Sequence, residues 1–122
     1  MHWCYRRPAA WAFLAAFAIA SASSAAPPPD KKTERLWKSK CASCHGAAGK
    51  GDTDQGKKMA VSDMTTKAWQ SSQTDEQIKK AILEGVKKEK GGVKQEMDGY
   101  KDSLTPEQVD ALVKYTRALA GS

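Results

Sequence analysis

The stretch KCASCHG at residues 40–46 restricts the fold and chemistry of this chain more than any other feature. Two cysteines three residues apart, followed directly by a histidine, occur in thiol redox pairs, in zinc sites and at points of covalent haem attachment. These sites need different surroundings, so the rest of the sequence decides among them.

The first 26 residues have the pattern of a secretory signal peptide. Arg6 and Arg7 precede an apolar run at 8–20 and a stretch of small residues at 21–26. The apolar run is short for a membrane span, which needs about 20 apolar residues, although an uncleaved membrane anchor is the alternative. We therefore expect export to the periplasm, with cleavage after Ala22, Ala25 or Ala26.

Cleavage changes the count of possible ligands. It removes Cys4 and His2, which leaves Cys41, Cys44 and His45 as the cysteines and the histidine of the shortened chain. Lys plus Arg falls from 20 to 18 against 14 Asp plus Glu, so the net charge falls from +6 to +4. The 96 residues that remain of 122 form one small domain, a size that often needs a metal, a disulfide or a cofactor for stability.

Covalent haem attachment fits KCASCHG better than the other two sites. Structural zinc takes four Cys or His ligands, and the shortened chain offers three. A thioredoxin-like pair begins a helix that follows a strand, whereas no run here alternates as a strand does and the pair follows a helical segment. Cysteines one helical turn apart can reach two vinyl groups on one porphyrin edge, and the next histidine then faces the iron.

Helical spacing of apolar residues indicates an all-α fold with three main helices. The first helix is expected to begin at about Asp30 or Thr33 and to run to Cys41, with Leu36, Trp37 and Cys41 on one face. Capping boxes begin the other two at Thr74 and Thr105. The buried stripe of the last helix is expected to be Val109, Leu112, Val113, Thr116, Leu119 and Ala120.

The polar segments 46–73 and 87–103 are expected to be loops. Since three short helices enclose little apolar volume, a haem between them would complete the core.

The axial ligands follow from the same residue count. His45 is expected to be the proximal ligand because cleavage leaves no other histidine. Ligation of the iron by two histidines is therefore excluded. The sixth ligand can be Met59, Met64, Met97, a lysine or none. We favour Met97 because its long separation from His45 lets the chain reach the opposite haem face, whereas Met59 follows His45 by only 14 residues; Met64 is expected to contact the haem edge.

Several further stretches resemble the class I c-type cytochromes, particularly the small monohaem bacterial electron carriers. They are Leu36-Trp37 before CASCHG, GAAGKGD after it, DMTTKAW at 63–69, TDEQIKKAILEG at 74–85 and MDGYKDSLTPEQVDALVKYTRALA at 97–120.

The resemblance implies a cytochrome c domain at 33–122, after a Pro-rich spacer at 27–32, with three main helices packed around one covalently bound haem c. It also implies that the first and last helices cross near Trp37 and residues 112–115, and that Met97 is the distal ligand.

The chain departs from the family at two positions near the iron. Asp98, not proline, follows Met97, and no proline lies between His45 and Met97. Family members often orient the proximal histidine with a proline carbonyl, so another carbonyl, in residues 56–62, is expected to do so here.

A haem closed by His45 and Met97 has no open position for substrate, which predicts a one-electron carrier and not an enzyme. The alternative is a haem enzyme or gas sensor with an open distal site, in which Met97 is an ordinary core residue. We expect redox partner proteins, no nucleic acid and a monomer. A group of lysines could form a docking surface for an acidic partner, or could simply be a solvated polar surface. The group consists of Lys57, Lys58, Lys87, Lys88, Lys90 and Lys94.

Overall fold

The computed structural model describes residues 28–122, so the expected signal peptide at 1–26 lies outside the described residues. Within them the chain forms six helices and one antiparallel hairpin. None of the described helices has the length and hydropathy needed to cross a membrane. The elements in chain order are α1 (Lys31–Lys40), α2 (Ala42–His45), α3 (Asp54–Lys58), α4 (Lys67–Ser72), α5 (Asp75–Glu84), β1 (Val86–Lys90), β2 (Val93–Met97) and α6 (Pro106–Ala118).

Side-chain caps begin the main helices where the sequence predicts them. The capping boxes at Thr74 and Thr105 are both present, and Pro106 occupies the first turn of α6. Asp30 caps α1 by accepting from the backbone N–H groups of Lys32 and Thr33. Each cap satisfies donors that a helix start would otherwise leave unpaired.

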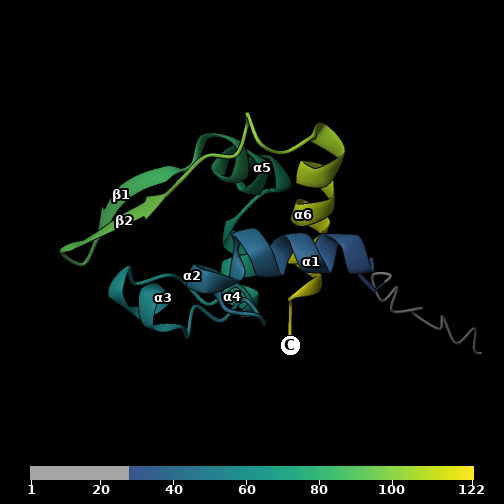
Figure 1. Cartoon of the computed structure of the whole chain (residues 1–122). Coiled ribbons are helices and arrows are strands. Elements are labelled where there is room, and N and C mark those ends of the chain that lie inside the picture. Colours follow the sequence, from purple (N-terminus) through teal and green to yellow (C-terminus); the bar gives the residue numbers. More distant parts are fainter. Residues whose placement is uncertain (1–27) are drawn as a thin grey trace, which may run out of the picture.

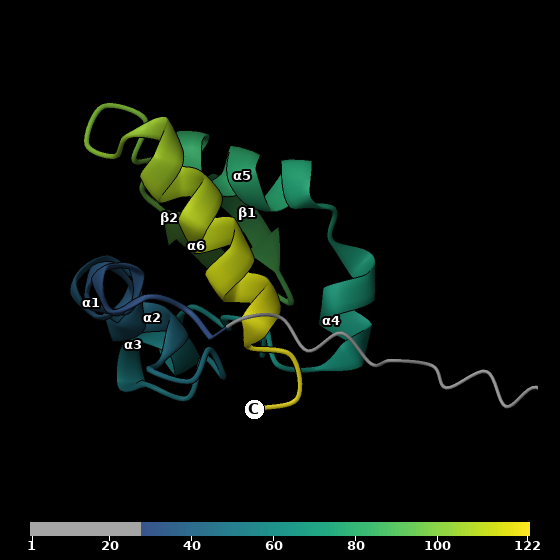
Figure 2. The same ribbon diagram turned by 90° about the vertical axis from the view of Figure 1, so that its right-hand side faces the viewer.

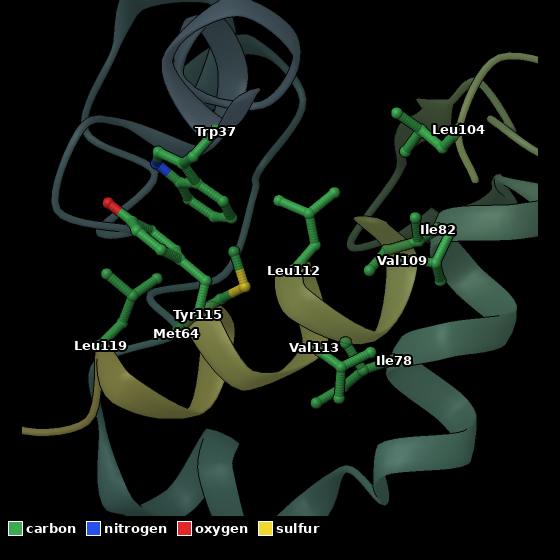
Figure 3. Close-up of a cluster of buried hydrophobic side chains, with 10 residues drawn as sticks. All are labelled: Trp37, Met64, Ile78, Ile82, Leu104, Val109, Leu112, Val113, Tyr115 and Leu119. Atoms are coloured by element: carbon green, nitrogen blue, oxygen red, sulfur yellow. The ribbon is translucent and has the colours of Figure 1, made fainter. Parts of the chain in front are cut away.

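The core forms where α1 crosses α6 (Figure 1). The rings of Trp37 and Tyr115 stack with centroids 5.0 Å apart, and Leu112 beside them is 1% exposed (Figure 3). This confirms the crossing that the family resemblance implies.

α6 lies between α5 on one side and the α1–α3 group on the other (Figure 2). Ile78 and Ile82 of α5 are buried in the same cluster as Val109 and Val113. The expected stripe of α6 is buried except at Ala120, which is exposed and lies two residues beyond the end of the helix at Ala118.

The β1–β2 hairpin was not expected, since 87–103 reads as a polar loop. Its register pairs Val86 with Met97 and Lys90 with Val93, around a two-residue turn at Gly91 and Gly92. Both glycines have positive φ, which two-residue hairpin turns require. The strands are polar because they lie at the surface, so the alternation that identifies a strand is weak. The hairpin projects from the helices toward α3 (Figure 1).

Arg117 of α6 binds the end of α4 and the start of α5. Its guanidinium donates to the Gln70 carbonyl at 2.8 Å and the Gln73 carbonyl at 2.6 Å, and forms an ion pair with Asp75 at 2.7 Å. These bonds fasten α4 and the start of α5 to α6.

Candidate haem-binding site

The CxxCH motif lies in a tight turn between α1 and α3. Cys41 caps the end of α1, and α2 carries Cys44 and His45. The Thr53 hydroxyl, at the start of α3, donates to the Ser43 carbonyl at 2.8 Å and the Cys44 carbonyl at 3.2 Å. α3 thus holds the backbone of the motif in place.

Gly56 allows this close approach of α3. A Cβ at Gly56 would overlap the Cys44 carbonyl oxygen. Any larger residue at this position would push α3 away from the motif.

The His45 side chain is half-buried beside the first helix. Nδ1 is buried and has no hydrogen-bond partner, and it is the one such side-chain atom among the described residues. The ring lies 5.9 Å from that of Trp37, whose indole N–H donates to the Gly46 carbonyl at 3.1 Å. Packing against Trp37 therefore orients the imidazole, and the carbonyl expected from residues 56–62 does not contact Nδ1.

A cavity of about 550 Å³ opens beside the motif. It is lined by Cys41, Cys44 and His45 on one side and by residues of α5, β2 and α6 on the others, among them Ile78, Ile82, Met97 and Leu112. A volume of this size is typical of cofactor sites, and both apolar and polar side chains line it. The structure therefore brings together all four predicted site residues.

All three candidate methionines line this cavity, but their surroundings differ. Met64 is 6% exposed and packs in the core beside Tyr115 (Figure 3). The thioether of Met59 accepts from the Gln55 amide at 3.3 Å. Met97 is half-buried at the end of β2, not in a loop as expected, and no hydrogen bond reaches its sulfur within the described chain.

Burial sets the protonation of the motif. It lowers the pKa of His45, which favours the neutral imidazole that binds metals. Burial, and next to it the neighbouring Cys44, raises the pKa of Cys41 to about 11. Cys41 is therefore a protonated thiol at neutral pH, and neither Cys41 nor Cys44 forms a disulfide.

A sequence model of the family described as cytochrome c matches residues 31–120. The chain belongs to the cytochrome c family. Within that family it is a class I c-type cytochrome, with the family's helical fold and a small added hairpin.

Known proteins similar to this cytochrome c include an oxidase subunit. The chain is 32% identical over 106 residues to the "Cbb3-type cytochrome c oxidase subunit FixP" of Azorhizobium caulinodans. The match covers 84% of this chain and 32% of that subunit, so the chain spans about a third of the length of this relative.

Solved structures of c-type cytochromes superpose on this chain. "KustC0563 c-type cytochrome" matches with a TM-score of 0.61 and 32% identity, covering 72% of this chain and 96% of that one. A tyrosine-to-phenylalanine variant of it matches with a TM-score of 0.59 and 32% identity, over 71% of this chain and 96% of that one. These likenesses support an electron-transfer role with haem as the cofactor.

The residues of the cavity fit a haem. The unpartnered His45 imidazole, two free thiols on the same turn and an apolar wall from α5 and α6 are the groups that a c-type haem requires. When bound, haem supplies reversible one-electron chemistry at its iron.

Sequence reasoning missed two residues that line the cavity and connect distant segments around it. Gln95 of β2 reaches the carbonyl groups after α3, and the Tyr100 hydroxyl donates to the Lys40 carbonyl at 3.0 Å. The Gly-Gly turn signal at 91–92 could have revealed the hairpin. Nothing in the sequence indicates the partners of Gln95 and Tyr100, which lie 35–36 and 60 positions away along the chain.

Proposed function

We propose that this cytochrome c is an exported, monohaem, one-electron carrier. Its haem is bound through Cys41 and Cys44 and ligated by His45 and Met97. The observation that carries the proposal is that His45 and Met97 line one cavity, where burial lowers the pKa of His45 and so favours its neutral form. A neutral imidazole and a thioether in the same cavity are the two ligands that such a carrier needs.

The two thiols provide the covalent attachment. Each cysteine would add its S–H across one vinyl C=C of the porphyrin, so that sulfur bonds to one carbon and hydrogen to the other, with no external oxidant. Both thiols are free, so neither has to be reduced first.

Met97 is the best-supported distal ligand of the three candidates. Met64 is a core residue, and Met59 already accepts a hydrogen bond from Gln55. A methionine opposite histidine raises the reduction potential, and two occupied axial positions leave none for substrate.

Absorption spectra of the holoprotein test the ligation. We expect one low-spin c-type haem per chain, with a red Fe(III)–Met charge-transfer band that is lost in Met97→Ala and kept in Met59→Ala. Pyridine haemochrome analysis checks the stoichiometry and the thioether bonds. A high-spin spectrum that shifts with carbon monoxide would contradict this function and favour an open-site enzyme or sensor.

The hairpin register sharpens the expected docking surface. Lys87 lies opposite Glu96, and Lys94 opposite Glu89, so their charges are offset within the hairpin. Lys88 lies opposite Gln95, is exposed and lines the cavity. We assign it the main role in attracting an acidic redox partner, and the relative's description as an oxidase subunit favours a protein partner.

Electron transfer rates test this surface. Lys88→Gln should slow reaction with an acidic partner protein at low ionic strength, and the difference should vanish at high salt because screening removes the attraction. Lys87→Gln is the matched control and should have a smaller effect. Equal effects of the two substitutions would contradict the assignment to Lys88.

Export to the periplasm rests on the N-terminal 26 residues. Expression with and without this segment, followed by cell fractionation and mass determination, tests it. We expect a periplasmic product that begins at residue 23, 26 or 27, and an intact N-terminus in the membrane fraction would instead identify an anchor.

A further inference from the structure

Side-chain hydrogen bonds fasten the β-hairpin to the segment that follows α3, and both segments line the cavity. The Gln95 amide donates to the Met59 carbonyl at 2.9 Å and to the Ala60 carbonyl at 2.6 Å. A weaker contact joins the Lys90 ammonium to the Ser62 hydroxyl at 3.1 Å. Neither strand makes an extensive contact with any described helix, so these bonds hold the hairpin over the cavity.

The chemistry of the two acceptors determines how the Gln95 amide is oriented. Both partners are backbone carbonyl oxygens, which only accept, so the amide nitrogen must face them. Gln95 is half-buried and lines the cavity, whereas Lys94 and Glu96 on either side are exposed. Residues two apart on a strand share a face, so Gln95 lies on the same face of β2 as Met97.

The partners of Gln95 belong to a rigid structure. α3 ends with Val61 N–H bonded to the Gly56 carbonyl and Ala60 N–H bonded to the Lys57 carbonyl, which is a Schellman motif. The other end of α3 binds the motif through the Thr53 hydroxyl. A continuous set of bonds therefore leads from the haem-attachment turn through α3 to Gln95 and β2.

At its base the hairpin is fixed by close backbone packing. The Tyr100 N–H donates to the Ile82 carbonyl at 2.9 Å, and Gly85 approaches the Met97 carbonyl so closely that a Cβ there would overlap it. Met97 thus lies between this base and the bonds of Gln95.

We propose that Gln95 is a positioning residue that holds Met97 in place as the distal ligand, and this rests on the proposed function. Without its bonds, the hairpin is held only at its base and by the weaker Lys90–Ser62 contact, and Met97 moves away from the iron more often. The two bonds predict an increase of about tenfold in the open population when they are lost.

The rate of imidazole binding to the oxidised holoprotein measures this opening, because a neutral external ligand enters only when Met97 has left. Gln95→Leu keeps a similar volume and removes the donor. It should raise the second-order rate constant, measured at low imidazole concentration, about tenfold, because that constant is proportional to the open population. Gln95→Arg supplies new N–H donors to the same carbonyl groups and should restore a rate near that of the wild type. Lys94→Gln, on the outer face of β2, is the matched control and should leave the rate unchanged.

Hydrogen exchange separates this proposal from the ligation on which it rests. The amide hydrogens of β1 and β2 should exchange faster in Gln95→Leu than in the wild type, while those of α6 should not change. If exchange and imidazole rates match the wild type in a folded Gln95→Leu protein, the positioning role is overturned. If the wild type lacks the Fe(III)–Met band, the proposed ligation fails instead, and faster hairpin exchange would still show that Gln95 fastens β2.

Discussion

At the scale of single residues, the position of Met97 depends on a neighbour with no side chain. Gly85 ends α5 with a φ of 80° and approaches the Met97 carbonyl. Few L-residues adopt this backbone conformation, and a Cβ would push β2 outward at Met97, the proposed ligand.

Gly85→Ala is therefore expected to weaken both stability and ligation. The backbone conformation alone costs about 1–3 kcal/mol, and the overlap displaces Met97. Thermal unfolding and the Fe(III)–Met band measure the two effects. Gly91→Ala is the control, because Gly91 also has positive φ but a Cβ there meets no atom within 4 Å. A band lost equally in both variants would contradict the role of the contact.

Ala60 shows the opposite case, since a side chain occupies a position suited to glycine. It is the one non-glycine residue with positive φ in the described part of the chain, at 48°, and it ends α3. The left-handed conformation costs an L-residue about 1–2 kcal/mol. Replacement by glycine removes this cost, but part of the benefit is lost because glycine has more conformational freedom in the unfolded chain.

We expect Ala60→Gly to raise the free energy of unfolding by about 0.5–1 kcal/mol. Denaturant titration of the holoprotein measures the change. Ala120→Gly serves as the reference, because Ala120 is exposed and has no positive φ. A stability gain in the reference as large as that at Ala60 would argue against relief of strain.

At the scale of elements, the start of α1 depends on an ionised side chain. Hydrogen bonds from the Thr33 backbone and hydroxyl, and then from Lys32, lower the pKa of Asp30. A lowered pKa means that the cap stabilises α1 above the ordinary Asp value of 3.8, and that this stabilisation is lost as the pH falls through the folded-state value.

Asp30→Asn should reduce the loss of stability at acid pH, because asparagine also caps helices but does not titrate. The melting temperature between pH 2 and pH 5 should fall less steeply than in the wild type, while at pH 7 the two should be similar. Asp30→Ala should lose stability at pH 7 as well. An unchanged acid slope in Asp30→Asn would show that other carboxylates dominate.

At the scale of the whole molecule, the core is built around the cavity. Side chains of the core, among them Ile78, Ile82 and Leu112, also line the cavity of about 550 Å³, so a group that fills the cavity packs directly against the core. The total stability of a small domain is only about 5–15 kcal/mol, so the fold depends on what fills the cavity.

Chain made without haem attachment should therefore unfold at low temperature and without a cooperative transition. Circular dichroism in the far and near ultraviolet would show residual helix without fixed aromatic packing. The holoprotein should melt cooperatively at a much higher temperature. A cooperative transition in the haem-free chain close to that of the holoprotein would contradict this dependence.

The amino-acid sequence by itself determined the features that depend on local chemistry. The caps at Thr74 and Thr105, the helical stripes and the CxxCH spacing each follow from residues within one or two turns of each other. The helical stripes predict the all-α class. The CxxCH motif together with these helices indicates the family, because few folds pack three such helices around a haem.

Only the tertiary structure decided which distant groups meet. The ring of Trp37 orients His45 where a carbonyl was expected, and Gln95 bonds to carbonyl groups 35 and 36 residues away. The strands escaped detection because a surface hairpin buries little apolar area and so leaves little alternation in its sequence. Contacts of this kind depend on how the helices pack, and packing is set by the whole chain at once.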